Sequence, residues 1–163
     1  MNVEKTGKRY IVQSESVYEA SPQALFAVLL DYENFDRVSS VFKDSRYVEP
    51  ADDGTPRAYT MVEGCVVFFC KSIERIDRLI VKPFTEIVAE SEPNPADFRY
   101  SRSQWRFETA GEATTIYYRM EMEPGFWVPP VIGPYYIKRV LKAGGSRAVS
   151  RIETLARGEE PVL

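Results

Sequence analysis

The chain has 163 residues, of which 44% are hydrophobic and 28% charged, and its net charge is −3. This composition suits one folded domain with an apolar core, and the small negative charge argues against general nucleic-acid binding. No apolar run approaches the roughly 20 residues that span a membrane, and no signal-peptide pattern follows the first residues. We therefore expect a cytoplasmic protein with a single domain over residues 1–163 and a core over about residues 9–157.

The sequence contains no histidine and two cysteines, Cys65 and Cys70. Without histidine the chain cannot form a Ser-His-Asp triad, a Cys-His pair or a His-ligated metal site. Two cysteines do not complete a four-cysteine zinc site, so we expect neither a metal nor a cofactor. In one continuous strand the two cysteines would lie roughly 16 Å apart, too far for a disulfide. We therefore expect free thiols and a reducing compartment.

The first part of the chain predicts one strand and two short helices. Residues 9–18 are rich in β-branched and aromatic residues and predict the first strand. Ser21 and Pro22 predict the start of a helix, with serine as the N-cap and proline at the first helical position. A second short helix is indicated by the spacing of Tyr32, Phe35 and Val38. We expect the two helices to cover one end of a sheet.

Residues 41–123 have the pattern of six short strands joined by turns, so the sheet should be antiparallel. The last strand alternates apolar and polar residues, which predicts one dry face and one wet face. Its apolar positions are Ile116, Tyr118, Met120 and Met122. In the strand before it, Phe98 and Tyr100 are out of phase with Trp105 and Phe107. This change of phase predicts a β-bulge near residues 101–103.

The end of the chain predicts one long amphipathic helix. Its apolar stripe has helical spacing and consists of Ile137, Leu141, Gly144, Ala148, Ile152 and Leu155. Residues 134–157 also contain six basic residues and a single acid, Glu153, a local charge of +5 that leaves −8 for the rest of the chain. Gly144 and Gly145 each cost a helix roughly 1 kcal/mol. We expect a close approach of the helix to the sheet, a kink, or room for a ligand at that point.

Three segments resemble a known superfamily. Residues Val17–Phe26 resemble the opening motif, apolar–x–Ala–Ser/Ala–Pro–x–x–x–Phe, of the polyketide cyclase/dehydrase and lipid-transport superfamily. Residues Asp31–Phe35 resemble its Asp–x–x–x–aromatic segment, and residues 98–107 are similar to a strand of the coenzyme Q-binding branch and the related ribosome-association toxins. The resemblance implies a START-like (SRPBCC) α+β domain with the helix-grip fold. In that fold a curved seven-stranded antiparallel sheet surrounds a long C-terminal helix, with two short helices after the first strand.

The resemblance also implies a pocket between the sheet and the long helix, where relatives bind quinones, sterols, lipids or polyketides. The aromatic, proline-rich stretch at residues 123–136 departs from the coenzyme Q-binding branch and weakens the transfer of the quinone assignment. We expect the pocket to hold an apolar, aromatic or lipid-like small molecule, because aromatic and methionine side chains suit such ligands. The ligand-binding candidates are Met61, Phe68, Trp105, Phe107, Tyr118, Met120, Trp127 and Tyr135.

The Phe126-Trp127 pair allows three interpretations: a gate to the pocket, a contact with a membrane or protein, or packing over the edge of the sheet. An exposed tryptophan beside a basic helix would suit transient contact with an anionic membrane surface. Ordinary packing and an ordinary solvated helix face are the simpler alternatives.

Binding or carriage of an apolar small molecule is the leading hypothesis for function. A cyclase or dehydrase is the first alternative, and without histidine its acid or base would come from residues such as Arg57, Glu63, Lys71 or Tyr118. A protein- or ribosome-interaction module is the second alternative. A buried Glu or Lys in the cavity would favour the enzyme, a fully apolar cavity the carrier, and a filled interior the interaction module.

Overall fold

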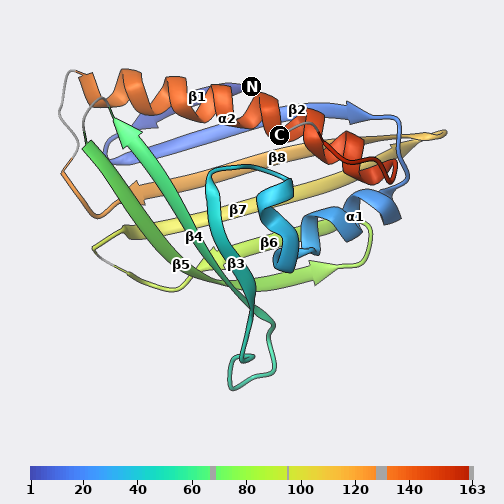
Figure 1. The fold of residues 1–163 in the computed structure, drawn as a ribbon, viewed down its shortest axis with the longest axis horizontal. Helices are drawn as coiled ribbons and strands as arrows, with labels where there is room; N and C mark the ends of the chain where they lie inside the picture. The colour runs from blue at the N-terminus through green and yellow to red at the C-terminus, as the bar shows by residue number, and fades with distance from the viewer. Residues whose placement is uncertain (67–68, 95, 128–131, 162–163) are drawn as a thin grey trace.

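The computed structural model describes residues 1–66, 69–94, 96–127 and 132–161. Eight strands form one antiparallel sheet in the order β1-β2-β8-β7-β6-β5-β4-β3. The strands are β1 (Asn2–Thr6), β2 (Arg9–Tyr18), β3 (Phe42–Val48), β4 (Arg57–Val66), β5 (Phe69–Lys82), β6 (Glu86–Ser91), β7 (Phe98–Ala110) and β8 (Ala113–Pro124). The helices are α1 (Pro22–Leu30), the 3-10 helix η1 (Tyr32–Arg37) and α2 (Ile132–Ala156). Figure 1 shows α2 running along the β1–β2 side of the sheet, with its C-terminal end beside α1.

This arrangement confirms the expected α+β helix-grip class, with one more strand than the seven predicted. The additional strand is β1, which pairs with β2 from Asn2↔Gln13 to Thr6↔Arg9. Gly7 has φ 60° in the turn between them, a conformation that glycine adopts without strain. The predicted strand at residues 9–18 is β2, and the six later strands are present. Among the described residues, no helix is long and apolar enough to cross a bilayer.

The short helices form where the sequence predicts them. The Ser21 hydroxyl accepts a hydrogen bond from the Ala24 N–H at 3.2 Å, and Pro22 begins α1. This cap satisfies one of the free N–H groups at the start of the helix. The second helix is the 3-10 helix η1, in which the rings of Tyr32 and Phe35 stack with centroids 4.7 Å apart. Both helices contribute buried side chains to the core on one face of the sheet.

The strand register separates the two faces of the sheet, because paired residues on neighbouring strands point to the same side. The core cluster includes Ile87, Phe107 and Ile116 of the sheet together with Ile152 of α2. We call the face that carries this cluster the inner face. The opposite, outer face carries rows of charged side chains.

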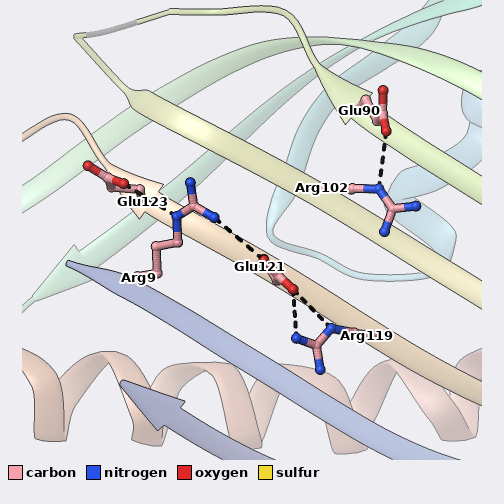
Figure 2. Close-up of polar contacts among 6 residues, drawn as sticks. All are labelled: Arg9, Glu90, Arg102, Arg119, Glu121 and Glu123. Carbon is pink, nitrogen blue, oxygen red and sulfur yellow. Dashed lines mark hydrogen bonds and ion pairs between the residues drawn. The ribbon is translucent and has the colours of Figure 1, made fainter. Parts of the chain in front are cut away.

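Figure 2 shows part of the outer face, where Arg9 lies 3.5 Å from Glu123 and 3.8 Å from Glu121. Arg119 approaches Glu121 at 2.6 Å, and a separate pair joins Arg102 to Glu90 at 3.1 Å. Such surface pairs each contribute about 0–1 kcal/mol, so their main effect is to keep this face polar.

Two expectations of local structure were wrong. The bulge in β7 lies at Arg99, between Phe98 and Tyr100, instead of at residues 101–103. Trp105 and Phe107 consequently share the inner face, whereas Tyr100 turns outward and stacks under the Arg9 guanidinium at 4.4 Å.

The second error concerns the cysteines. Cys65 and Cys70 lie opposite each other on β4 and β5, because the segment read as one strand is a hairpin. Cys70 is disulfide-bonded, so the expectation of two free thiols fails. The inference of a reducing compartment loses its basis with it.

Candidate functional site

The inner face is packed at one end and only partly covered at the other. Residues of α1, η1 and the C-terminal half of α2 pack on the sheet at the packed end, where Leu25, Ile87 and Ile152 are buried. In the N-terminal half of α2, Ile137 and Leu141 are only half-buried, as are Met120 and Met122 of β8. Apolar side chains left partly uncovered between a helix and a sheet are typical of a small-molecule pocket. We give the name inner cavity to this partly covered region, which is defined by Met120 and Met122 of β8 and Ile137 and Leu141 of α2.

Trp105 and Tyr118 lie side by side on the inner face, with ring centroids 5.1 Å apart. Both side chains are half-buried. Burial nevertheless raises the pKa of Tyr118, whose hydroxyl lies 3.5 Å from the Ser103 Oγ.

A buried ion pair lies on the inner face of β5. Arg75 Nη2 is 3.0 Å from Asp77 Oδ2, and the Asp77 side chain is 1% exposed. Arg75 Nη1 donates to Ser101 Oγ at 3.3 Å, and the Ser91 hydroxyl donates to the second carboxylate oxygen of Asp77. The pair therefore has the additional hydrogen bonds that buried charges need.

Among the described residues, two buried polar atoms at this pair have no hydrogen-bond partner. They are the hydroxyl of Thr60, which is 1% exposed, and the Nε of Arg75. Thr60 and Arg75 are register partners on β4 and β5, so their side chains are neighbours on the inner face. Buried polar atoms almost always have a partner, so these two atoms are exceptions. We call Thr60, Arg75, Asp77 and Ser101 the inner polar cluster.

Tyr32 of η1 lies within electrostatic reach of this cluster. Its side chain is 2% exposed, and burial together with the negative charge of Asp77 raises its pKa. Tyr32 and Tyr118 therefore remain protonated at neutral pH and are able to donate hydrogen bonds. The chemistry available here is hydrogen-bond donation and charge, next to apolar surface.

The structure brings together Trp105, Tyr118 and Met120 of the predicted ligand-binding residues, all on the inner face. Phe107 shares this face but is 6% exposed and packs on Phe26 at 5.3 Å, so it belongs to the core. Met61 alternates with the inward-facing Thr60 and therefore points to the outer face, which corrects its expected position. Phe68 lies outside the described residues.

Trp127 and Tyr135 lie on either side of the connection between β8 and α2, and their side chains are 78% and 68% exposed. Phe126 is half-buried, and its ring lies 4.3 Å from the Lys71 Nζ. Lys71 also forms an ion pair with Asp97 at 3.0 Å. These contacts hold the β4–β5 hairpin against the β8 end of the molecule, and we call this end the rim.

The other charged candidates lie away from the cavity. Arg57 is on the outer face, where it binds Glu92 at 2.9 Å and the Glu49 carbonyl at 2.8 Å. Glu63 is exposed. Sequence reasoning missed Arg75 and Asp77, because β5 contains charged residues in both phases and its inward-facing side cannot be identified without the pairing.

Three solved structures illustrate what the fold resembles. A START superfamily protein from Mycobacterium smegmatis is 14% identical, with 91% of this chain and 97% of that chain covered and a TM-score of 0.70. Human STARD10 is 10% identical, with 94% and 73% covered and a TM-score of 0.69. The Zhui aromatase/cyclase from Streptomyces sp. R1128 is 14% identical, with 92% of each chain covered and a TM-score of 0.61. At these identities the likeness shows the START-like fold alone.

No curated protein shows significant sequence similarity to the chain. The profile of one family, described as polyketide cyclase / dehydrase and lipid transport, matches residues 18–142. That range begins at the last residue of β2 and contains α1, η1, β3 to β8, the connection at the rim and the first part of α2. The chain therefore belongs to the polyketide cyclase / dehydrase and lipid transport family.

Proposed function

We propose that this protein binds and carries an apolar small molecule in the inner cavity, between the sheet and α2. The observation that carries this proposal is the pair of half-buried rings of Trp105 and Tyr118 on the inner face, with centroids 5.1 Å apart. Met120 and Met122 continue the same surface along β8. Aromatic rings and flexible thioethers together accommodate a flat or partly flexible apolar ligand.

The buried Arg75–Asp77 pair places charged groups on the inner face, and this observation favours a cyclase or dehydrase as the second candidate. An enzyme of this kind needs a base that can accept a proton. The Asp77 oxygens are already engaged by Arg75 and Ser91, and the raised pKa values of Tyr32 and Tyr118 keep both phenols protonated. The cluster is thus better suited to holding a ligand than to removing a proton from it.

The rim supports a further part of the proposal, transient contact with an anionic membrane surface from which the ligand is collected. Trp127 and Tyr135 are exposed there. Residues 124–152 contain five basic residues and no acidic residue. Amphipathic aromatic rings and clustered basic residues both favour an anionic interface.

Vesicle co-sedimentation tests this contact. We expect Trp127→Ala and the pair Arg139→Glu/Lys142→Glu to weaken binding to vesicles that contain phosphatidylserine, and added salt to weaken it further. The pair Lys8→Glu/Lys43→Glu makes the same change of charge at exposed positions outside α2. Equal loss in both pairs would mean that only net charge matters, and the proposed contact through α2 would be wrong.

Mass spectrometry of the denatured, gently purified protein tests the carrier function. We expect a stoichiometric apolar compound that is absent from a mock purification. Tyr118→Ala and Trp105→Ala should lower its occupancy, whereas Tyr117→Ala, on the outer face of the same strand, should not. Absence of any compound, with no change in melting temperature on adding lipids or aromatic compounds, would refute the proposal.

A further inference from the structure

The outer face of the sheet contains a hollow of about 570 Å³ over strands β2, β8 and β7. Small-molecule sites typically occupy about 300–1,000 Å³, so the hollow has room for a ligand. We call it the outer hollow. Its lining includes two rows of outward-facing side chains, which the strand register places next to one another. The first row is Gln13, Arg119 and Gln104, and the second is Glu15, Tyr117 and Arg106.

The outer hollow has a floor of main chain between these two rows. Ser14 and Tyr118 also line the hollow, but they alternate with the outward-facing residues, so their side chains point to the inner face. Asn2, the register partner of Gln13, extends the first row onto β1. Figure 2 shows the Arg119 guanidinium on this face. The hollow is therefore polar, in contrast to the apolar inner cavity on the opposite face.

The arginines of the outer hollow already have carboxylate partners. Arg119 lies 2.6 Å from Glu121. Arg106 lies 3.6 Å from Glu108. Glu15 adds a third carboxylate, so these groups comprise two positive and three negative charges. An anionic ligand would meet three carboxylates, and a cationic ligand would lie beside two guanidinium groups. The charges therefore favour an uncharged ligand.

The arrangement of the polar groups indicates which uncharged ligand fits. The two rows are about 7 Å apart along each strand, and neighbouring strands are about 4.8 Å apart. Side-chain amides such as those of Gln13 and Gln104 both donate and accept hydrogen bonds, as hydroxyl groups do. A sugar ring carries hydroxyls around its whole edge and can bond to both rows at once. A ligand with one polar edge would leave one of the rows without partners.

We propose that the outer hollow binds an uncharged sugar of one or two rings. The Tyr117 ring between Glu15 and Arg106 offers an apolar surface for the C–H groups of the sugar. We expect millimolar dissociation constants, because side chains such as Gln13 and Arg106 are exposed to competing water. The proposal is independent of the carrier function, since the side chains that it uses lie on the other face of the sheet.

NMR titration of the ¹⁵N-labelled protein tests the proposal. Maltose, cellobiose and N-acetylglucosamine are the uncharged probes, glucosamine is the cationic probe and glucuronate is the anionic probe. We expect uncharged probes to cause saturable shifts of the Glu15 and Tyr117 backbone amides and of the Gln13 side-chain amide. Both charged probes should bind several times more weakly.

Two variants with matched controls assign the effect to the outer hollow. Gln13→Leu should weaken binding of the uncharged probes about threefold to tenfold, the effect of one hydrogen bond. Gln23→Leu, the same change at an exposed position of α1, should not. Glu121→Gln removes the partner of Arg119 and should raise the affinity for glucuronate severalfold. Glu112→Gln, in the exposed turn between β7 and β8, should leave it unchanged.

Three results would overturn the inference. The first is the lack of a saturable shift at these amides with any uncharged probe. The second is tighter binding of glucuronate or glucosamine than of the uncharged probes, and the third is an equal effect of Gln13→Leu and Gln23→Leu. The carrier function stands or falls separately, on the compound that co-purifies with the protein.

Discussion

Tyr18 shows how a single buried residue makes the stability of this protein depend on pH. Tyr18 is 3% exposed, and burial raises its pKa to about 12. Between the ordinary tyrosine pKa of about 10 and this value, the folded state holds a proton that the unfolded state has lost. Stability is therefore complete below pH 10 and falls as the pH rises toward 12.

Urea unfolding at pH 9 to 12 checks this prediction. The wild-type free energy of unfolding should fall with pH, and the contribution of Tyr18 to that fall should be about 2 kcal/mol, from a shift of about two pKa units. Tyr18→Phe keeps the ring and removes the titrating group, so its profile should be flatter. Tyr135→Phe, at an exposed position, should follow the wild type, and an identical slope in all three proteins would contradict the prediction.

Asp77→Ala should destabilise the protein by about 3–5 kcal/mol, because it leaves the Arg75 guanidinium buried without its counter-ion. The matched surface pair is Arg78 with Asp53, 2.5 Å apart and both well exposed. Asp53→Ala should cost less than about 1 kcal/mol. Chemical denaturation of both variants at pH 7 gives the comparison. Similar losses of unfolding free energy would contradict the prediction that removing a buried counter-ion costs more than removing an exposed one.

At the scale of elements, the two central glycines of α2 have different surroundings. A Cβ on Gly145 would lie 2.0 Å from the Met1 Cε, so the helix approaches the N-terminal residue closely here. Gly144 has open space around its missing Cβ. A close approach therefore exists at Gly145, but against the Met1 side chain, which precedes β1, and not against the sheet as expected. At Gly144 the structure leaves open space beside the helix, which agrees with the alternative expectation of room at this point.

Gly144→Ala should raise the free energy of unfolding by about 0.5–1 kcal/mol, because alanine favours the helix and meets no neighbour. Thermal unfolding of the ligand-free protein provides the measurement. Gly145→Ala should gain less, since the end of the Met1 side chain must move. A loss of stability in Gly144→Ala would mean that the space beside it is filled in solution.

Elements with a strong local signal were predictable, and elements that depend on pairing were not. The Ser21-Pro22 start of α1, the alternation in β8 and the apolar stripe of α2 each follow from local chemistry. β1 was missed because its charged residues surround a single buried residue, Val3. The β4–β5 hairpin was missed because strand pairing, a long-range property, decides where the chain reverses. The inner polar cluster depends on that pairing, so it was missed too.

At the scale of the whole molecule, stability should be concentrated at the packed end and low around the inner cavity. Regions with few buried apolar contacts open at lower free energy than the core. A ligand that binds only the folded state stabilises it in proportion to the logarithm of its concentration. Ligand binding should therefore raise the free energy of local opening most strongly in the half-covered part of α2.

Hydrogen exchange followed by mass spectrometry checks this distribution. Amides in residues 132–146 should exchange faster than those in α1, and addition of the co-purifying ligand should slow the first group more than the second. Equal protection of both segments in the ligand-free protein would mean that the inner face is filled along its whole length, as in an interaction module.

The placement of α2 along one side of the sheet also makes the molecule an electric dipole. Residues 134–157 carry +5, and the rest of the chain carries −8. Near an anionic surface such a body experiences a torque before it makes any contact, because its acidic side is repelled while its basic side is attracted. The approach is thereby oriented, and the side that carries α2 arrives first. Above roughly 0.1 M salt this torque acts only within about 10 Å of the surface. The protein is therefore oriented only shortly before it makes contact.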